Sequence, residues 1–113
     1  MQSAAEFQSS LDRFLARRGQ PATLQRRNAG TVTMSAALTV FMRGYTPQEI
    51  VDGTGIIQGD SLVIMSITDL INASWPGGSP RAGDFLLVGG SLRRIVSAPA
   101  RPIGVGFDLQ CRG

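Results

Sequence analysis

The main candidates for acid–base chemistry in this chain are carboxylates, because its 113 residues include no histidine and no lysine. The usual general base near neutral pH and the commonest metal ligand are therefore missing. Schiff-base catalysis and the phosphate-binding P-loop both need a lysine. The single cysteine, Cys111, cannot build a cysteine-rich zinc site, and its alternation with Val105, Phe107 and Leu109 indicates a small core residue. These residue types predict a protein that is not an enzyme and that binds no cofactor or metal.

The remaining candidates for catalysis are aspartates close to predicted turns. Asp52 and Asp60 flank a glycine-containing segment, and Asp69, Asp84 and Asp108 lie at strand or turn ends. Two carboxylates can serve glycoside hydrolysis, but aspartates before and within turns are ordinary, since they bind nearby backbone amides. The glycines of that segment lack the following helix and the spacing of a phosphate site. We interpret the aspartates as structural and the segment as a flexible loop.

Six of the 11 arginines occur as three doublets. Neighbouring residues on a strand point to opposite faces, so a doublet there places one guanidinium on each side. No aromatic residues interleave with the doublets, and the net charge is only +3, which argues against a nucleic-acid platform. We expect a solvated face or interface ion pairs. Trp75, before Pro76, is interpreted as a loop anchor in preference to an interface hot spot. The candidate interface residues are Arg17, Arg18, Arg26, Arg27, Trp75, Arg93 and Arg94.

An amphipathic helix is predicted over residues 3–18. Apolar side chains recur at helical spacing from Ala4 to Leu15, and Ser3 and Glu6 have the spacing of a capping box. Gly19 can supply the left-handed stop, and Pro21 prevents continuation.

Strand patterns fill the rest of the chain. Asn28-Ala29-Gly30 and Gly89-Gly90 suit tight hairpin turns. Strands in quick succession with such turns indicate an antiparallel barrel or sandwich. We therefore predict one mainly β domain over residues 1–113, a small antiparallel β-barrel of about six strands (22–113) with an N-terminal helix. The predicted strands are 22–27, 31–45, 61–67, 84–88, 91–97 and 104–112.

The long connection between the second and third strands is the main candidate for function. Loops of this length in a small domain are usually functional or mobile. Thr46 could cap a single helical turn with Pro47 in its first position, whereas Asp52-Gly53-Thr54-Gly55 has no regular signal. The candidate loop residues are Thr46, Pro47, Gln48, Glu49, Ile50, Val51, Asp52, Gly53, Thr54, Gly55, Ile56, Ile57, Gln58, Gly59 and Asp60.

Several segments from Arg43 to Gly113 resemble, in pattern and order, one family of tailed phages and prophages. They are Arg43 to Ile50, Gln58 to Ser66, Thr68-Asp69-Leu70, Trp75-Pro76, Arg81 to Asp84, and Phe107 to Gly113. The family is that of head-completion proteins, also called stoppers or head–tail connectors, which includes members in gene transfer agents.

The resemblance implies a ring of identical subunits at the neck of a virion or phage-like particle, assembled in a bacterial cytoplasm. Such a ring would bind a portal–adaptor ring above and a tail terminator or tail tube below. The matching loop, residues 46–60, would project into the central channel and help to retain packaged double-stranded DNA. No stretch of the sequence is long and apolar enough to suggest a membrane partner.

Two alternatives stay open. The first is another neck or tail ring subunit, such as a tail terminator, which is also small and rich in strands. The second is a small-barrel module that binds nucleic acid, which predicts binding that weakens steeply with added salt.

Overall fold

The chain folds into a closed antiparallel β-barrel, which confirms the predicted fold class. The computed structural model describes residues 4–52, 55–76, 78–101 and 104–113. Ser3, Gly53 and Thr54, which took part in the predictions above, lie outside the described residues. In chain order the elements are α1 (Ala4–Arg18), β1 (Gln20–Asn28), β2 (Thr31–Gly44), α2 (Pro47–Asp52), β3 (Ser61–Ser66), α3 (Ile67–Asn72), β4 (Phe85–Val88), β5 (Ser91–Ser97) and β6 (Gly106–Arg112).

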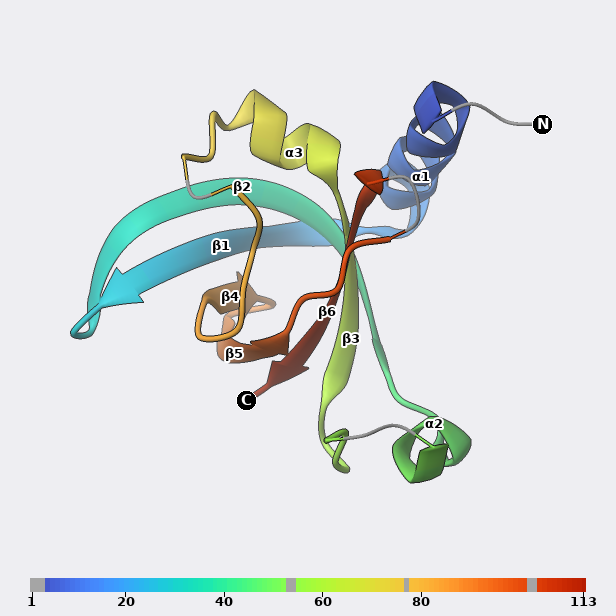
Figure 1. Ribbon diagram of the computed structural model, residues 1–113, viewed down its shortest axis with the longest axis vertical. Coiled ribbons are helices and arrows are strands. Elements are labelled where there is room, and N and C mark those ends of the chain that lie inside the picture. The colour runs from blue at the N-terminus through green and yellow to red at the C-terminus, as the bar shows by residue number, and fades with distance from the viewer. Residues whose placement is uncertain (1–3, 53–54, 77, 102–103) are drawn as a thin grey trace.

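The strands follow the order β1-β2-β3-β6-β5-β4 around the barrel, and β4 pairs with β1 to close it (Figure 1). Each strand alternates inward apolar and outward side chains, as period two requires. The barrel interior is aliphatic, and its fully buried side chains include Leu24, Val40, Met65, Leu86 and Leu109. Cys111 is also buried there, in agreement with its predicted core position.

The β1–β2 hairpin extends well beyond the other strands (Figure 1). β1 pairs with β4 only from Ala22 to Gln25, and β2 pairs with β3 only from Phe41 to Gly44. The hairpin turns at Ala29 and Gly30, which both have positive φ, as predicted for a tight turn. Gly89 and Gly90 do the same between β4 and β5.

Helix α1 packs against the outside of the barrel at β2 and β3. Leu15 is buried, and the Phe14 ring meets Phe41 of β2 edge to face at 5.1 Å between centroids. A polar cluster also holds the helix in its position on the barrel, because the carboxylate of Asp12 accepts hydrogen bonds from Ser66 and, at 2.8 Å, from the hydroxyl of Thr68. The helix is therefore tied to the end of β3 and the start of α3.

Several element boundaries differ from the sequence prediction. Residues 67–72 form a full helix, α3, because Ser66 caps it by accepting the N–H of Thr68. The last strand begins at Gly106 and not at the predicted residue 104, and the carbonyl of Arg101 accepts the N–H of Gly104 at 3.1 Å just before it.

Candidate functional site

We call the connection between β2 and β3, residues 46–60, the α2 lobe, of which the structure describes residues 46–52 and 55–60. In Figure 1 it lies beyond the end of the barrel, away from α1 and α3. Its helix, α2, starts at Pro47 as predicted but continues to Asp52, so the helix is longer than the single turn that was expected.

Reciprocal capping explains why so short a helix forms. The hydroxyl of Thr46 accepts the N–H of Glu49 at 3.2 Å, and the Glu49 carboxylate accepts the N–H of Thr46 at 2.9 Å. This is a capping box, which satisfies backbone donors that the first turn would otherwise leave unpaired. The lobe therefore carries its own local order.

Glu49 also connects α2 to the end of β2. Both of its carboxylate oxygens accept hydrogen bonds from the guanidinium of Arg43, at 2.8 and 3.0 Å. These bonds, followed by the one from Thr46, lower the pKa of Glu49 to about 2. The forked ion pair fixes the direction in which the lobe leaves the barrel.

The other end of the lobe is fastened by Asp60, whose side chain is completely buried. Its carboxylate accepts hydrogen bonds from Arg112 at 2.8 and 2.9 Å, from the Gln110 amide at 2.9 Å and from the N–H of Ile57 at 3.1 Å. The bonds from Arg112 contribute most to holding the pKa of Asp60 far below its usual range. We call Asp60, Gln110 and Arg112 the β6 latch.

The β6 latch also reaches the middle of the lobe. The carbonyl of Gly55 accepts hydrogen bonds from both Gln110 and Arg112, each at 3.0 Å. The lobe is thus more ordered than the irregular loop expected from the sequence: residues 47–52 are helical, and β6 donates hydrogen bonds to Gly55 and Asp60.

Between these two attachments the lobe presents apolar side chains to solvent. Val51 is 78% exposed, and Ile57 is also largely exposed. A depression of about 540 Å³ lies between the lobe and the barrel end, with Tyr45, Pro47 and Ile50 among its lining residues. Burial raises the pKa of Tyr45. An exposed apolar lobe on a rigid attachment suits contact with another molecule.

The predicted turn aspartates do have structural roles, and several reach further than their own turn. Asp84 accepts the N–H of Arg81 at 3.0 Å and pairs with Arg26, and Asp69 accepts the N–H of Thr39 at 2.9 Å. Asp108 pairs with Arg101 at 2.6 Å. In the part of the chain that is described, no three histidine, cysteine or acidic side chains gather as a metal site would require.

The candidate interface residues do not form one surface. Arg17 and Arg18 are exposed at the end of α1. Arg26 is an exception to the predicted solvated face, since its side chain is only 11% exposed, donates to Asp84 from Nε and Nη2 and lies over Trp75. Arg27 lies over the Phe85 ring at 5.3 Å.

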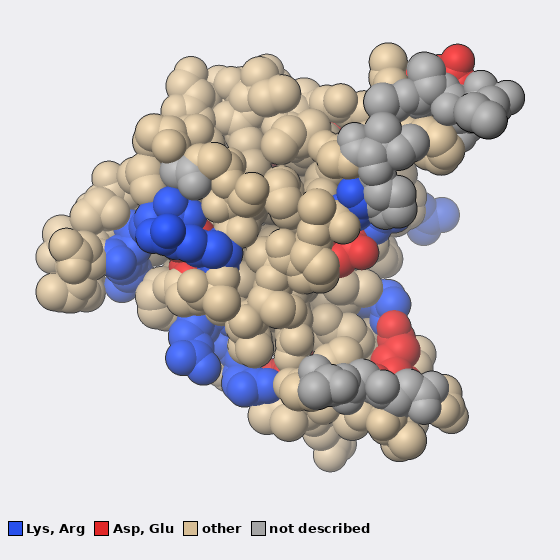
Figure 2. Space-filling view, in the orientation of Figure 1, with Lys and Arg blue, Asp and Glu red and all other residues tan. Residues whose placement is uncertain are grey.

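The second half of the set is also divided. Trp75 is buried in the core, in agreement with a loop anchor. Arg94 is exposed, whereas the Nε of Arg93 is buried. Figure 2 shows the arginines of one face in separate groups, several of them beside carboxylates.

Sequence reasoning missed the β6 latch. Gln110 and Arg112 follow the alternation of a final strand and carry no motif of their own. Only the pairing of β3 with β6, which sets Ser61 opposite Cys111, brings them to Asp60.

Comparisons with known proteins do not identify a family for the chain. No protein-family model and no curated protein matches the chain. None of the helices that the structure describes has the length and apolar character needed to span a bilayer.

Proposed function

We propose that this chain is a structural, non-catalytic subunit of the head–tail interface of a phage-like particle, a stopper that assembles as a ring beneath a portal–adaptor complex. The α2 lobe narrows the central channel, and the remaining surfaces of the ring bind the adaptor above and the tail below. The proposal joins the resemblance noted in the sequence to the shape of the barrel and the lobe.

The observation that carries the proposal is the construction of the α2 lobe. It leaves the barrel between adjacent strands, is fixed at one end by Arg43 and Glu49 and at the other by Asp60, and exposes Val51. A lobe that only connected two strands would need none of this, because Gly44 and Ser61 already lie opposite each other in register. In a ring, one such lobe per subunit becomes a many-fold constriction.

The described residues also support a role based on shape. Glu49, Asp60 and Asp84 are each engaged by an arginine, which leaves them poorly placed as acids or bases. Cys111 is buried, and burial raises its pKa to about 12, so it is a poor nucleophile.

Removal of the lobe tests the proposal. The opposition of Gly44 and Ser61 allows residues 46–59 to be replaced by an Asn-Gly pair, which leaves Tyr45 and Asp60 in a short hairpin loop. Filled, tailless heads completed with this variant should lose DNA to nuclease, whereas heads completed with the wild-type chain should protect it.

A matched control keeps the length of the lobe and replaces residues 51–58 with glycine and serine. Ring assembly should survive in both variants, because neither alters the barrel. DNA protection by the shortened variant equal to that of the wild type would exclude the channel role.

A further inference from the structure

The positive charge of the chain is concentrated on one side of the barrel, formed by β4, β5 and the adjoining ends of β1 and β6. Among the described side chains, six of the 11 arginines and only two carboxylates, those of Asp60 and Asp84, lie there. The rest of the chain has five arginines and six acidic side chains. The net charge of +3 therefore conceals a separation of charge, and Figure 2 shows blue groups along the side where β4, β5 and the C-terminus lie in Figure 1. The six arginines are Arg26, Arg27, Arg81, Arg93, Arg94 and Arg112.

A row of outward side chains crosses these four strands in register. Gln25 of β1 lies opposite Phe85 of β4. Phe85 lies opposite Arg94 of β5, which in turn lies opposite Arg112 of β6. A neighbour of each along its strand is buried inside the barrel, so the row lies on the outer face. Four adjacent strands span about 14 Å.

Arg27 joins this row through the Phe85 ring, since its guanidinium lies 5.3 Å from the ring centroid. Its Nε and Nη2 donate to Oε1 of Gln25 at 3.2 and 2.8 Å, whereas its Nη1 has no acceptor among the described residues. A guanidinium that is already held in this way loses little further freedom when an anion binds to it. We call Arg27, Phe85, Arg94 and Arg112 the basic row.

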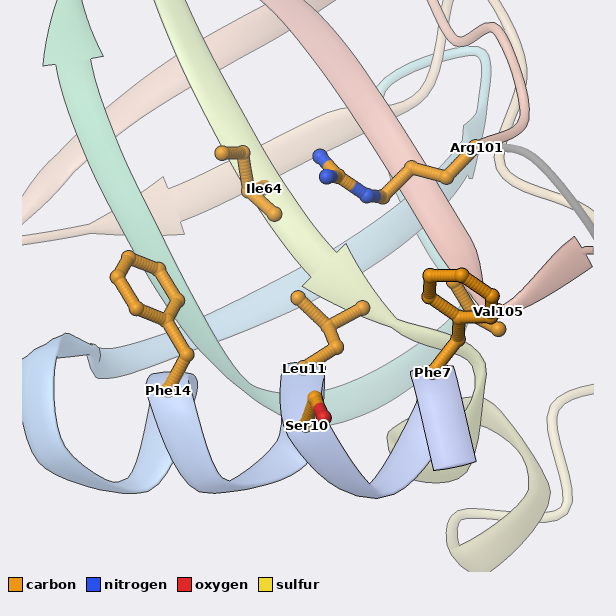
Figure 3. Close-up of a pocket in the computed structure, with 7 residues that line it drawn as sticks. All are labelled: Phe7, Ser10, Leu11, Phe14, Ile64, Arg101 and Val105. Carbon is orange, nitrogen blue, oxygen red and sulfur yellow. The ribbon is translucent and has the colours of Figure 1, made fainter. Parts of the chain in front are cut away.

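The basic row differs from the other basic positions of the barrel in having donors to spare. Arg94 is exposed and has no counter-ion among the described residues. By contrast, Arg101 lines the apolar groove between α1 and β3 (Figure 3) and pairs with Asp108. Arg43 is bound by Glu49. The basic row is therefore the part of the barrel surface where guanidinium groups remain available to an external anion.

The position of the basic row relates it to the α2 lobe. Arg112 belongs to the row and also to the β6 latch, because it donates to Asp60 and to the carbonyl of Gly55. The row thus begins where the lobe is attached and runs across β5 and β4 to β1. A lobe that narrows a channel places this attachment beside whatever the channel contains.

We propose that the basic row binds the phosphate backbone of the duplex DNA that the lobe retains. This inference rests on the proposed function for the presence of DNA beside the lobe. Guanidinium groups form charge-assisted hydrogen bonds with phosphates, and such contacts carry no sequence preference, which suits DNA of any sequence. The sequence alone argued against a nucleic-acid surface because it hides both the separation of charge and the approach of Phe85 to Arg27.

Substitution of the two arginines that do not hold the lobe tests the basic row. Arg27→Gln with Arg94→Gln removes two guanidinium groups and leaves the β6 latch intact. Arg17→Gln with Arg18→Gln is the matched control, because it removes the same charge from the exposed end of α1. Fluorescence anisotropy of a labelled duplex of about 20 base pairs measures binding by the full chain as salt rises from about 50 to 200 mM.

The wild type should bind the duplex with a Kd of about 10⁻⁴ M or tighter at the lower salt concentration. The row variant should bind at least about tenfold more weakly, and its slope of log affinity against log salt should be shallower by about two, since two phosphate contacts are lost. The control should bind within about twofold of the wild type. Circular dichroism verifies folding, and Arg94→Gln alone, with a slope change of about one, replaces the double variant if that variant is unfolded.

Three results would overturn the basic row as a DNA site. They are a wild-type chain that does not bind at submillimolar concentration and low salt, equal losses in the row variant and the control, and binding of poly-L-glutamate as tight as that of the duplex. The last result would assign the row to an acidic protein instead. Removal of the lobe judges the proposed function separately, because that variant keeps every residue of the basic row.

Discussion

The substitution Asp60→Asn tests whether the β6 latch fixes the lobe. Asparagine keeps the shape of aspartate but loses the charge, and it turns an acceptor into a donor that faces donors. Gln110 cannot compensate by turning its amide without losing the hydrogen bond that its Nε2 donates to the carbonyl of Gly55 at 3.0 Å, because a carbonyl can only accept. The guanidinium of Arg112 would lose its counter-ion.

The expected loss follows from burial. The Asp60 side chain is fully buried and that of Arg112 is 34% exposed, so the penalty lies below that of a completely buried pair. We expect the free energy of unfolding to fall by about 2 to 4 kcal/mol. For a domain of this size, such a loss lowers the melting temperature by roughly 8 to 16 °C.

Asp108→Asn is the matched control, because the same change there breaks an ion pair with Arg101 in which both side chains are at least one-third exposed. It should cost less than about 1 kcal/mol. Urea unfolding followed by far-ultraviolet circular dichroism measures both losses. Equal losses in the two variants would refute the argument that the β6 latch holds the lobe.

The pH dependence of Asp60 has a defined sign. Its pKa is lowered in the folded chain, so the stabilisation is complete above the unfolded value of about 3.9 and is lost as the pH falls below it. The stability difference between wild type and Asp60→Asn should therefore narrow in acid. A difference that stays constant down to strong acid would contradict the pairing with Arg112.

Three further outcomes follow from the structure. NMR titration should place the pKa of Glu49 near 2, and Arg43→Gln should raise this pKa toward its ordinary value. The stability that the pair contributes is complete above the ordinary pKa of a glutamate and disappears as the pH falls to about 2. The thiol of Cys111 should resist a thiol reagent in the folded chain and react once urea unfolds it, because burial raises its pKa to about 12. Gly106→Ala should lower the free energy of unfolding by at least about 2 kcal/mol, since a Cβ there would lie 2.0 Å from a backbone oxygen of β3. In the control Gly44→Ala the added Cβ meets nothing within 4 Å, so the loss should be much smaller. Equal losses in these two glycine variants would contradict the close approach of β6 to β3.

Sequence reasoning predicted the barrel because its signals are local. Alternation along each strand, the positive φ of Gly89 and Gly90, and the cap at Thr46 all depend on neighbours within a few residues. The helix α1 was equally accessible, because its apolar stripe lies within one segment. The left-handed stop predicted at Gly19 is wrong, since this glycine does not have positive φ.

Contacts between distant segments could not be predicted in the same way. Alternation shows which face a residue occupies but not which strand lies beside it, so the partners of Asp60 on β6 and of Arg26 at Asp84 were hidden. The apolar groove between Phe14 of α1 and the barrel was not predicted either, because an apolar stripe predicts that a helix is buried without saying how much of the stripe the barrel covers.

The position of the α2 lobe in the assembled protein tests the central claim most directly. A cryo-electron microscopy reconstruction of the assembled chain should show a closed ring in which residues 46–60 point toward the axis and narrow the passage. A ring with this segment on its outer rim, or a chain that forms no ring in the particle, would contradict the account.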